Sequence, residues 1–141
     1  MVTGERANEV RNLLERVRMW AEARPDVVAV GMAGSWARGD ARMDSDVDLV
    51  ILTHEPRGYV EGETWIQTFG GLRIVRTQAW GPMTERRFVL SSGLEVEAGI
   101  VPPSWAVTDP VDPELPPIVR DGFRILYDPE ERLARLLEAC I

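Results

Sequence analysis

Residues 34–52 read Gly-Ser-Trp-Ala-Arg-Gly-Asp-Ala-Arg-Met-Asp-Ser-Asp-Val-Asp-Leu-Val-Ile-Leu, and this stretch decides the fold. Its second half joins a cluster of aspartates to an apolar run from Val47 to Thr53, which predicts a buried strand. Asp46 and Asp48 alternate on that strand, so their side chains point to one face about 6.6 Å apart. At an effective dielectric constant of about 20, two such charges 6 Å apart repel by roughly 2.8 kcal/mol. A divalent cation between the carboxylates reverses the sign of the interaction, and their hard oxygen atoms suit Mg²⁺.

A solvated loop and a calcium loop are the alternatives for these aspartates. Against a solvated loop, Val47 and the apolar residues 49–52 anchor the acids to a core. Against an EF-hand, Leu49 stands at the sixth position, where the sharp turn needs glycine, and Pro56 follows where a helix should begin. The metal-binding interpretation is therefore preferred.

The turn that precedes the aspartates has the chemistry of a phosphate site. Gly34 allows a ligand to approach the backbone closely, and Ser35 offers a hydroxyl and an amide to phosphate oxygens. No Gly-Lys-Ser/Thr follows, so this is not a P-loop, and the dinucleotide fingerprint is also missing. A glycine–serine turn is weak evidence by itself, and its fixed distance from Asp-x-Asp is what makes the pattern specific.

The remaining elements predict a small α/β (α+β) domain with a mixed sheet flanked by helices. Apolar residues at helical spacing predict a first helix from Glu5 to Ala23. Strands are predicted at residues 26–33, 47–53, 72–79, 86–90, 94–101 and 123–127, with a closing helix capped by Asp128. Residues 57–71 are expected to be irregular, and residues 102–117 to form a proline-rich connection. Residues 1–141 are expected to form one domain, with a catalytic core of about 26–101 and a C-terminal segment of 102–141.

Composition excludes several classes of protein. The 141 residues (15.8 kDa) are 45% hydrophobic and carry a formal net charge of −7. All basic residues are arginine and no basic tail exists, which argues against avid binding of nucleic acid. A lone Cys140 permits no intramolecular disulfide, and no apolar run is long enough for a membrane span. A cytoplasmic location is expected.

Gly34-Ser35, ten intervening residues and then Asp46-Val-Asp48 resemble the signature of the DNA polymerase beta-like nucleotidyltransferase superfamily. The details Ala-Arg-Gly and Ser-Asp-Val-Asp-Leu are similar to its minimal nucleotidyltransferases and to aminoglycoside nucleotidyltransferases. The resemblance is close over residues 29–52 and looser elsewhere. It implies a nucleotidyltransferase fold, two Mg²⁺ ions bound by Asp46 and Asp48 together with a nucleotide triphosphate, and a triphosphate held by Gly34 and Ser35.

The same resemblance implies a third carboxylate on a neighbouring strand. Glu95 and Glu97 alternate with apolar residues in the predicted strand 94–101, so both face one side. Glu97 is chosen as metal ligand or base, with Glu95 in reserve, and a solvated strand face is the alternative for both. The family more often has Asp here, and the longer Glu changes the reach to the metals, which favours a base role over metal ligation.

Three arginines are candidates for the site. Arg38 could contact a phosphate, and pairing with Asp40 or Asp44 is an equal alternative. Arg86 and Arg87 precede the acidic strand on alternate faces, so one of them could enter the site, with Arg87 held in reserve.

The resemblance implies a Mg²⁺-dependent adenylyltransferase that moves a nucleoside monophosphate from a nucleotide triphosphate, ATP being the expected donor, to an acceptor hydroxyl. The acceptor is left open between a small molecule and a protein. An antitoxin that works with a helical HEPN-type toxin ranks as a near equal of the small-molecule transferase. The non-enzymatic alternative is a nucleotide-binding or partner-binding module without turnover, and a homodimer is one way to complete the acceptor site.

Overall fold

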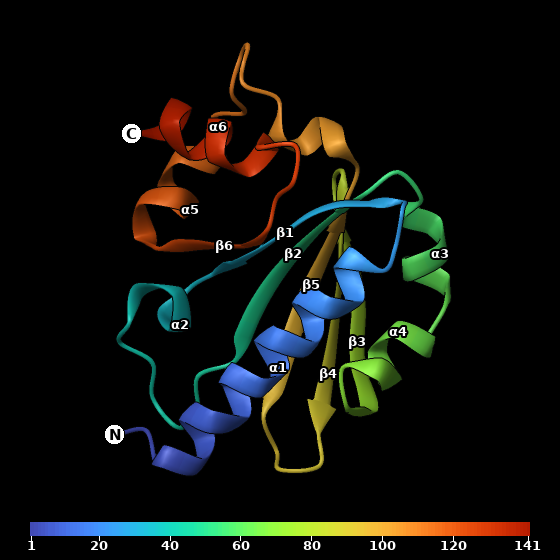
Figure 1. Ribbon diagram of the computed structural model, residues 1–141, viewed down its shortest axis with the longest axis vertical. Coiled ribbons are helices and arrows are strands. Elements are labelled where there is room, and N and C mark those ends of the chain that lie inside the picture. The colour runs from blue at the N-terminus through green and yellow to red at the C-terminus, as the bar shows by residue number, and fades with distance from the viewer.

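The valine-rich run after Pro25 and the apolar run after Asp46 form neighbouring strands at the centre of a mixed sheet in the computed structural model, which describes residues 1–141 (Figure 1). The strands are β1 (Val27–Ala33), β2 (Val47–Thr53), β3 (Gly71–Trp80), β4 (Met83–Leu90), β5 (Glu95–Val101) and β6 (Phe123–Tyr127). They lie in the order β3-β4-β5-β2-β1-β6. Every neighbouring pair is antiparallel except β2 and β5, which are parallel. The predicted class, a mixed sheet flanked by helices, is confirmed.

Helix α1 (Gly4–Glu22) covers one face of this sheet (Figure 1). The hydroxyl of Thr3 accepts a hydrogen bond from the Arg6 amide at 3.1 Å, so the helix begins with a side-chain cap. Its apolar stripe is buried, as the spacing predicts, at Val10, Leu13, Leu14, Val17, Trp20 and Ala21. Charged residues occupy the outer side, and no helix of the chain has the length and apolar character needed to cross a bilayer.

An aromatic cluster completes the core beneath α1. Five rings meet with centroids 5.0–6.5 Å apart, mostly edge to face, and they belong to Trp20, Tyr59, Trp65, Phe69 and Phe88. Such pairs contribute about 0.5–1.5 kcal/mol each beyond the burial of their area. The cluster lies among the apolar side chains that β2, β4 and β5 turn toward α1.

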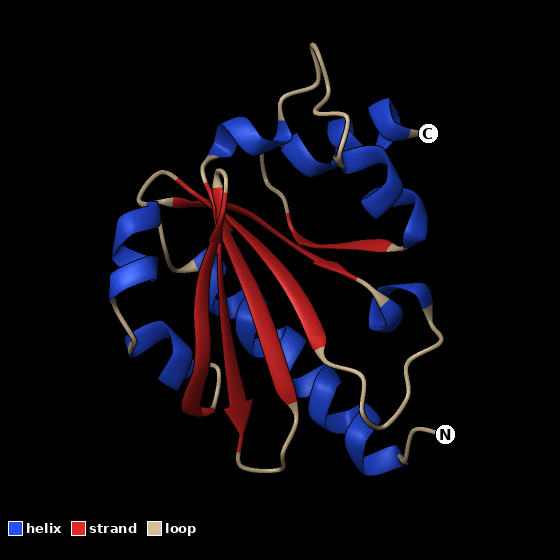
Figure 2. Cartoon of the chain, turned by 180° about the vertical axis from the view of Figure 1, so that it is seen from behind, coloured by secondary structure: helices blue, strands red, loops and turns tan.

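The opposite face of the sheet is covered only in part. A 3₁₀ turn, η1 (Pro103–Ala106), and the helices α5 (Leu115–Asp121) and α6 (Arg132–Cys140) pack a smaller core over one end of it. The Asp128 carboxylate accepts from the amides of Leu133 and Ala134 at 3.1 and 2.9 Å, which caps α6 as predicted. Seen from this side, the other end of β2, β5, β4 and β3 has no helix in front of it (Figure 2).

The expectation that residues 57–71 are irregular is wrong. Two short helices, α3 (Pro56–Glu61) and α4 (Thr64–Thr68), lie there beside β3 and β4. Pro56 fits because the first helical position needs no amide hydrogen. The hydroxyl of the buried Tyr59 donates to the Asp26 carboxylate at 2.6 Å, so tertiary contacts hold α3 where the local sequence gives little helical signal.

The proline-rich connection also contains more regular structure than predicted. Pro103 begins η1, and Pro116 and Pro117 lie in the first turn of α5, where a missing amide hydrogen costs nothing. As expected, none of these prolines lies in a strand of the sheet. The connection therefore carries the helices that cover one end of the open face.

Candidate active site

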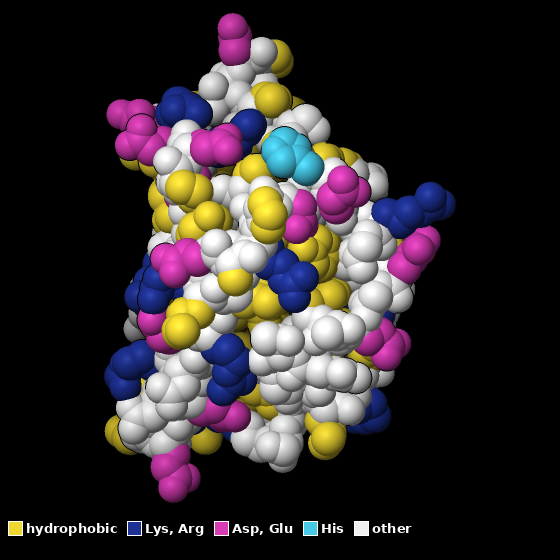
Figure 3. Space-filling model, turned by 45° about the vertical axis from the view of Figure 1, so that its right-hand side comes forward, with side chains coloured by type: hydrophobic (Ala, Val, Ile, Leu, Met, Phe, Trp, Pro, Cys, Tyr) yellow, Lys and Arg dark blue, Asp and Glu magenta, His cyan; other side chains and the backbone are white.

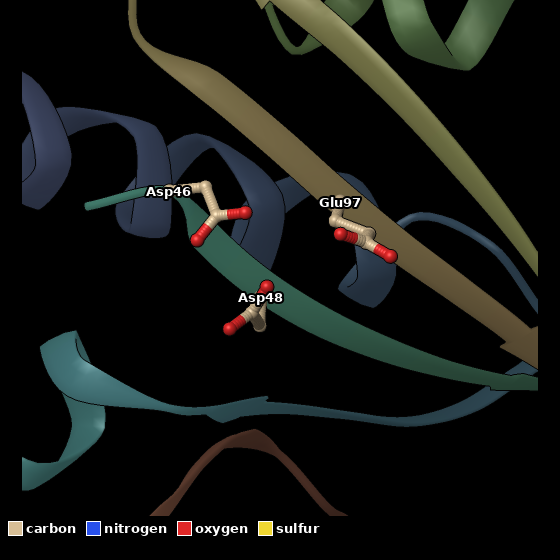
Figure 4. A group of neighbouring side chains, drawn as sticks. All are labelled: Asp46, Asp48 and Glu97. Carbon is tan, nitrogen blue, oxygen red and sulfur yellow. The ribbon is translucent and has the colours of Figure 1, made fainter. Parts of the chain in front are cut away.

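Three carboxylates meet where β2 and β5 run side by side. The parallel register places Asp48 opposite Glu97, and Asp46 lies just before β2 on the same side. Each offers an oxygen atom, and these atoms all lie within 4.8 Å of one another (Figure 4). Alternation along β2 explains the pairing of the two aspartates, whereas Glu97 joins them only through the register of the sheet.

The carboxylates lie on the open face of the sheet. Val47 and Leu49 pack into the core beneath α1, so Asp46 and Asp48 point the other way, and the α1 ribbon lies behind the strands that carry them (Figure 4). The side chains of Asp46 and Glu97 are 33% and 17% exposed. The cluster is therefore partly desolvated and still open to a ligand.

Asp48 is the carboxyl on which this environment acts most strongly. Burial and the neighbouring Asp46 charge raise its pKa to about 7, Glu85 adds to the effect, and Arg87 opposes it. The Asp48 carboxyl is therefore partly protonated near neutral pH, unless additional positive charge stabilises its ionised form. Converging carboxylate oxygens whose negative charge is not fully compensated are suitable ligands for a divalent cation such as Mg²⁺.

The guanidinium of Arg87 contacts three acidic side chains of this face, Asp46, Glu95 and Glu97. It lies opposite Glu97 in the β4–β5 register, and its Nη2 is 2.8 Å from Oδ2 of Asp46. The same nitrogen donates to Glu97, and Nη1 donates to Glu95 at 3.2 Å. Of the two arginines predicted to face opposite ways, Arg87 enters the site, while Arg86 is buried on the other face and donates to the carbonyls of Tyr59 and Gly62. Glu95 contacts Arg87 but lies outside the group of three carboxylates.

The glycine–serine turn lies directly against this cluster. Gly34 has φ +83°, and a Cβ built there would be 2.5 Å from Oδ2 of Asp48. Only glycine fits both the backbone conformation and the space. Ser35 begins the four-residue helix α2 (Ser35–Arg38), so the turn and the acids are neighbours in space as well as in sequence.

Arg38 points away from the carboxylates. Its Nε donates to Asp40 at 2.9 Å, and its Nη1 donates to the Asp121 side chain at 2.8 Å and to the Asp121 carbonyl at 3.0 Å. The contact with Asp40 is the ion pair named as the alternative to a phosphate contact, and Asp44 pairs with Arg42 instead. Arg38 thereby ties α2 to the end of α5, and a phosphate contact by Arg38 stays a prediction.

Two arginines at this site escaped the sequence analysis. Arg76 on β3 lies opposite Arg87, and its Nη2 is 3.7 Å from Oε1 of Glu97. Arg73 precedes it on the same strand. Alternation alone assigns these two to opposite faces, because they are three residues apart. No local signal marks the irregularity in the ladder between Ile74 and Arg76 that brings them together.

A surface hollow lies away from the carboxylates. A depression of about 600 Å³ lies between α1 and β6, with Met32, Trp36 and Arg124 in its wall. Met32 belongs to the core on the α1 side, so this hollow is on the face opposite the carboxylates. The candidate site is an open sheet surface rather than an enclosed cavity. It is identified by its converging carboxylates and not by its shape.

The chain is similar to one described protein family and to several solved structures. Residues 8–89 match the family model described as streptomycin adenylyltransferase, and no curated protein matches the chain. Among solved structures, the Cid1 poly(U) polymerase is 17% identical with a TM-score of 0.52, and Cid1 in complex with the UTP analog UMPNPP is 17% identical with a TM-score of 0.53. A cytoplasmic RNA terminal U-transferase gives the same identity and a TM-score of 0.53. Each match covers 70% of this chain and 31% of the other, so the chain spans about a third of those proteins and shares their fold.

Proposed function

The chain belongs to the streptomycin adenylyltransferase family, whose model matches residues 8–89, and on that premise we propose that it transfers a nucleoside monophosphate from ATP to an acceptor hydroxyl. The observation that carries the proposal is the meeting of Asp46, Asp48 and Glu97 within 4.8 Å beside the Gly34 turn. Pairs of divalent cations on such carboxylates are a general device for phosphoryl transfer.

In the proposed reaction the acceptor oxygen attacks the α-phosphorus of ATP. A bond forms between these two atoms, the bond from the α-phosphorus to the bridging oxygen breaks, and pyrophosphate leaves with that oxygen. Two Mg²⁺ ions held by Asp46, Asp48 and Glu97 would lower the pKa of the acceptor hydroxyl and neutralise the departing pyrophosphate. Glu97 is the residue to receive the hydroxyl proton, because it lies at the side of the cluster away from the turn.

Gly34 and Ser35 are proposed to hold the β- and γ-phosphates. The support is their position: the turn abuts Asp48, so phosphates bound there would reach a cation shared with the carboxylates. The absence of a Cβ at Gly34 lets a phosphate approach the backbone. We assign the catalytic core to residues about 26–101, which hold every residue named for this reaction, and the covering helices to residues 102–141.

Replacement of the aspartates tests the proposal. Purified protein would be incubated with Mg²⁺ and α-labelled ATP. Nucleotide binding would be followed together with the slow release of AMP and pyrophosphate in which water takes the acceptor's place, so that the acceptor need not be known. We expect Asp46→Asn and Asp48→Asn each to abolish Mg²⁺-dependent binding and release. Asp44→Asn is the matched control, because Asp44 is 81% exposed and pairs only with Arg42. ATP binding that is independent of both the metal and the two aspartates would overturn the assignment.

One observation favours binding without turnover as the second candidate. The Arg87 guanidinium contacts Asp46 and Glu97, and a cation that stays there would compete with metal. Arg87→Met separates the two functions. If Arg87 only blocks the site, the variant gains pyrophosphate release that the wild type lacks, whereas a working transferase already releases pyrophosphate with Arg87 in place.

A further inference from the structure

One row of side chains crosses the open face from the edge strand to the carboxylates. The strand register pairs Arg76 with Arg87, Arg87 with Glu97, and Glu97 with Asp48, so these four residues follow one another across β3, β4, β5 and β2. Neighbouring strands lie about 4.8 Å apart, which puts the β3 backbone about 10 Å from that of β5. The row changes from basic at the edge to acidic at the centre.

Arg73 adds a second guanidinium at the basic end. It pairs with Val89, and Val89 pairs with Glu95 on the acidic face. Because the ladder shifts register between Ile74 and Arg76, Arg73 and Arg76 both lie on this face although they are three residues apart. The shift thus produces a two-arginine strip, Arg73 and Arg76, beside the candidate site.

The two arginines of the strip have N–H groups that no carboxylate of the chain engages closely. Arg87 is engaged by Asp46, Glu95 and Glu97, so its charge is already balanced. Arg76 has one long contact, 3.7 Å to Glu97, and its side chain is 49% exposed. Arg73 is exposed and forms no salt bridge in the chain. The face over α3 and α4, by contrast, shows side chains of the two signs interspersed (Figure 3).

The carboxylates separate this strip from the glycine–serine turn. Gly34 follows β1 and touches Asp48 from one side, whereas β4 and β3 extend from Glu97 on the other. If phosphates of ATP occupy the turn, the acceptor reaches the α-phosphorus from the arginine side. Arg73 and Arg76 are then acceptor contacts rather than nucleotide contacts.

We propose that the acceptor carries a phosphate group about 10 Å or less from the hydroxyl that is modified, and that Arg73 and Arg76 bind this phosphate. Guanidinium groups bind phosphate through paired, charge-assisted hydrogen bonds, and two of them on one strand suit a single phosphate. A polycationic acceptor such as streptomycin, which gives the family its description, would meet like charge on this side. The inference rests on the proposed function, since it names the acceptor class of the same reaction.

Acceptor competition tests the inference. Three probes would be offered with Mg²⁺ and α-labelled ATP: ribose 5-phosphate, an RNA tetranucleotide with a free 3′-hydroxyl, and streptomycin. We expect label on a phosphate-bearing probe and none on streptomycin. Label on ribose 5-phosphate assigns small phosphorylated compounds as the source of the phosphate, and label on the tetranucleotide alone assigns nucleic acid.

Substitution of the strip supplies the second measurement. Arg73→Gln and Arg76→Gln should each raise the KM for the labelled probe about tenfold or more, the loss expected for a charge-assisted hydrogen bond, while the KM for ATP changes less than about twofold. Calorimetric titration of ribose 5-phosphate into protein without metal or ATP should show the same loss of affinity. Arg57→Gln is the control, because Arg57 is 87% exposed on α3 and pairs with Glu61. This helix packs Tyr59 into the core on the α1 side of the sheet, opposite the strip.

Different experimental results would contradict the acceptor inference and the proposed function. Streptomycin labelled as fast as the phosphate probes, or a rise in the KM for ATP instead of the probe, overturns the inference and leaves the transferase intact. Absence of any affinity for both phosphate probes also overturns it. Loss of Mg²⁺-dependent ATP binding in the wild type would instead contradict the proposed function itself.

Discussion

The two faces of the sheet present side chains of opposite character, although the same strands supply both. Toward α1, β2 and β5 present Val47, Leu49 and Val96 to an apolar core. On the other side, Asp46, Asp48 and Glu97 gather with Arg87 on a surface that no helix covers at that end. Because side chains alternate along a strand, residues that stabilise the core and residues that form the candidate site are neighbours in the sequence but lie on opposite faces. Packing on the apolar face fixes the positions of the strands, and these positions bring the charged side chains together on the other face.

The first way to break this comparison is to damage the apolar face alone. Phe69 is fully buried and contacts Trp20, Trp65 and Phe88. Phe69→Ala should lower the free energy of unfolding by about 3–5 kcal/mol through lost burial and a residual cavity. Urea denaturation measures this. Below its unfolding transition the variant should keep wild-type Mg²⁺-dependent ATP binding, and a loss of binding in folded protein would show that the faces are not independent.

The second way is to damage the charged face without touching the core. Gly34→Ala places a Cβ 2.5 Å from the Asp48 carboxylate and strains a backbone at φ +83°. We expect ATP binding to fall about 100-fold, since the turn and the carboxylate cannot both keep their positions.

Gly39→Ala is the matched control for this substitution. Gly39 has φ +87° and no neighbour within 4 Å of an added Cβ. It should cost about 1 kcal/mol of stability from backbone strain and leave ATP binding unchanged. Equal losses of binding in both variants would attribute the effect to strain alone.

A third prediction concerns the charge balance of the open face. Arg87 is 21% exposed and holds three carboxylates together. Arg87→Met should lower the free energy of unfolding by about 2 kcal/mol in EDTA, because the carboxylates are left without a partner. Millimolar Mg²⁺ should restore most of this loss if a metal ion can take the place of the guanidinium. Denaturation with and without Mg²⁺ measures both values, and an equal loss in the two conditions would contradict metal binding at this cluster.

The smallest effect expected is a pH dependence that belongs to Asp48. Its pKa of about 7 in the folded protein lies above the ordinary value of 3.8, so its proton stabilises the fold below about pH 4 and that contribution is lost as pH rises through 7. In EDTA the wild type should therefore lose about 1–2 kcal/mol more than Asp48→Asn between pH 5 and pH 8, an amount reduced by partial exposure of the carboxyl. Urea denaturation at the two pH values measures the difference. Identical pH profiles would contradict the raised pKa.

Much of this arrangement could be predicted from local patterns. The valine-rich run of β1 and the apolar run of β2 are strong strand signals, and Asp46 and Asp48 follow from alternation. Helices α3 and α4 were missed because they are short and are held by tertiary contacts such as the hydrogen bond from Tyr59 to Asp26. Strip residues Arg73 and Arg76 were missed because an irregularity in a ladder leaves no mark in the sequence.

The sequence by itself determined the family signature, the strands that carry it and the face shared by Asp46 and Asp48, because these depend on residues close together in the chain. Only the tertiary structure decided that Glu97 rather than Glu95 joins them, that Arg87 lies among the acids, and that Arg38 pairs with Asp121. Each of these contacts depends on the register of paired strands or the packing of distant elements. A shift of one residue in the pairing of β2 with β5 would turn the acids toward the core. The burial of Val47, Leu49 and Val96 excludes that shift, so the apolar face sets the position of the charged one.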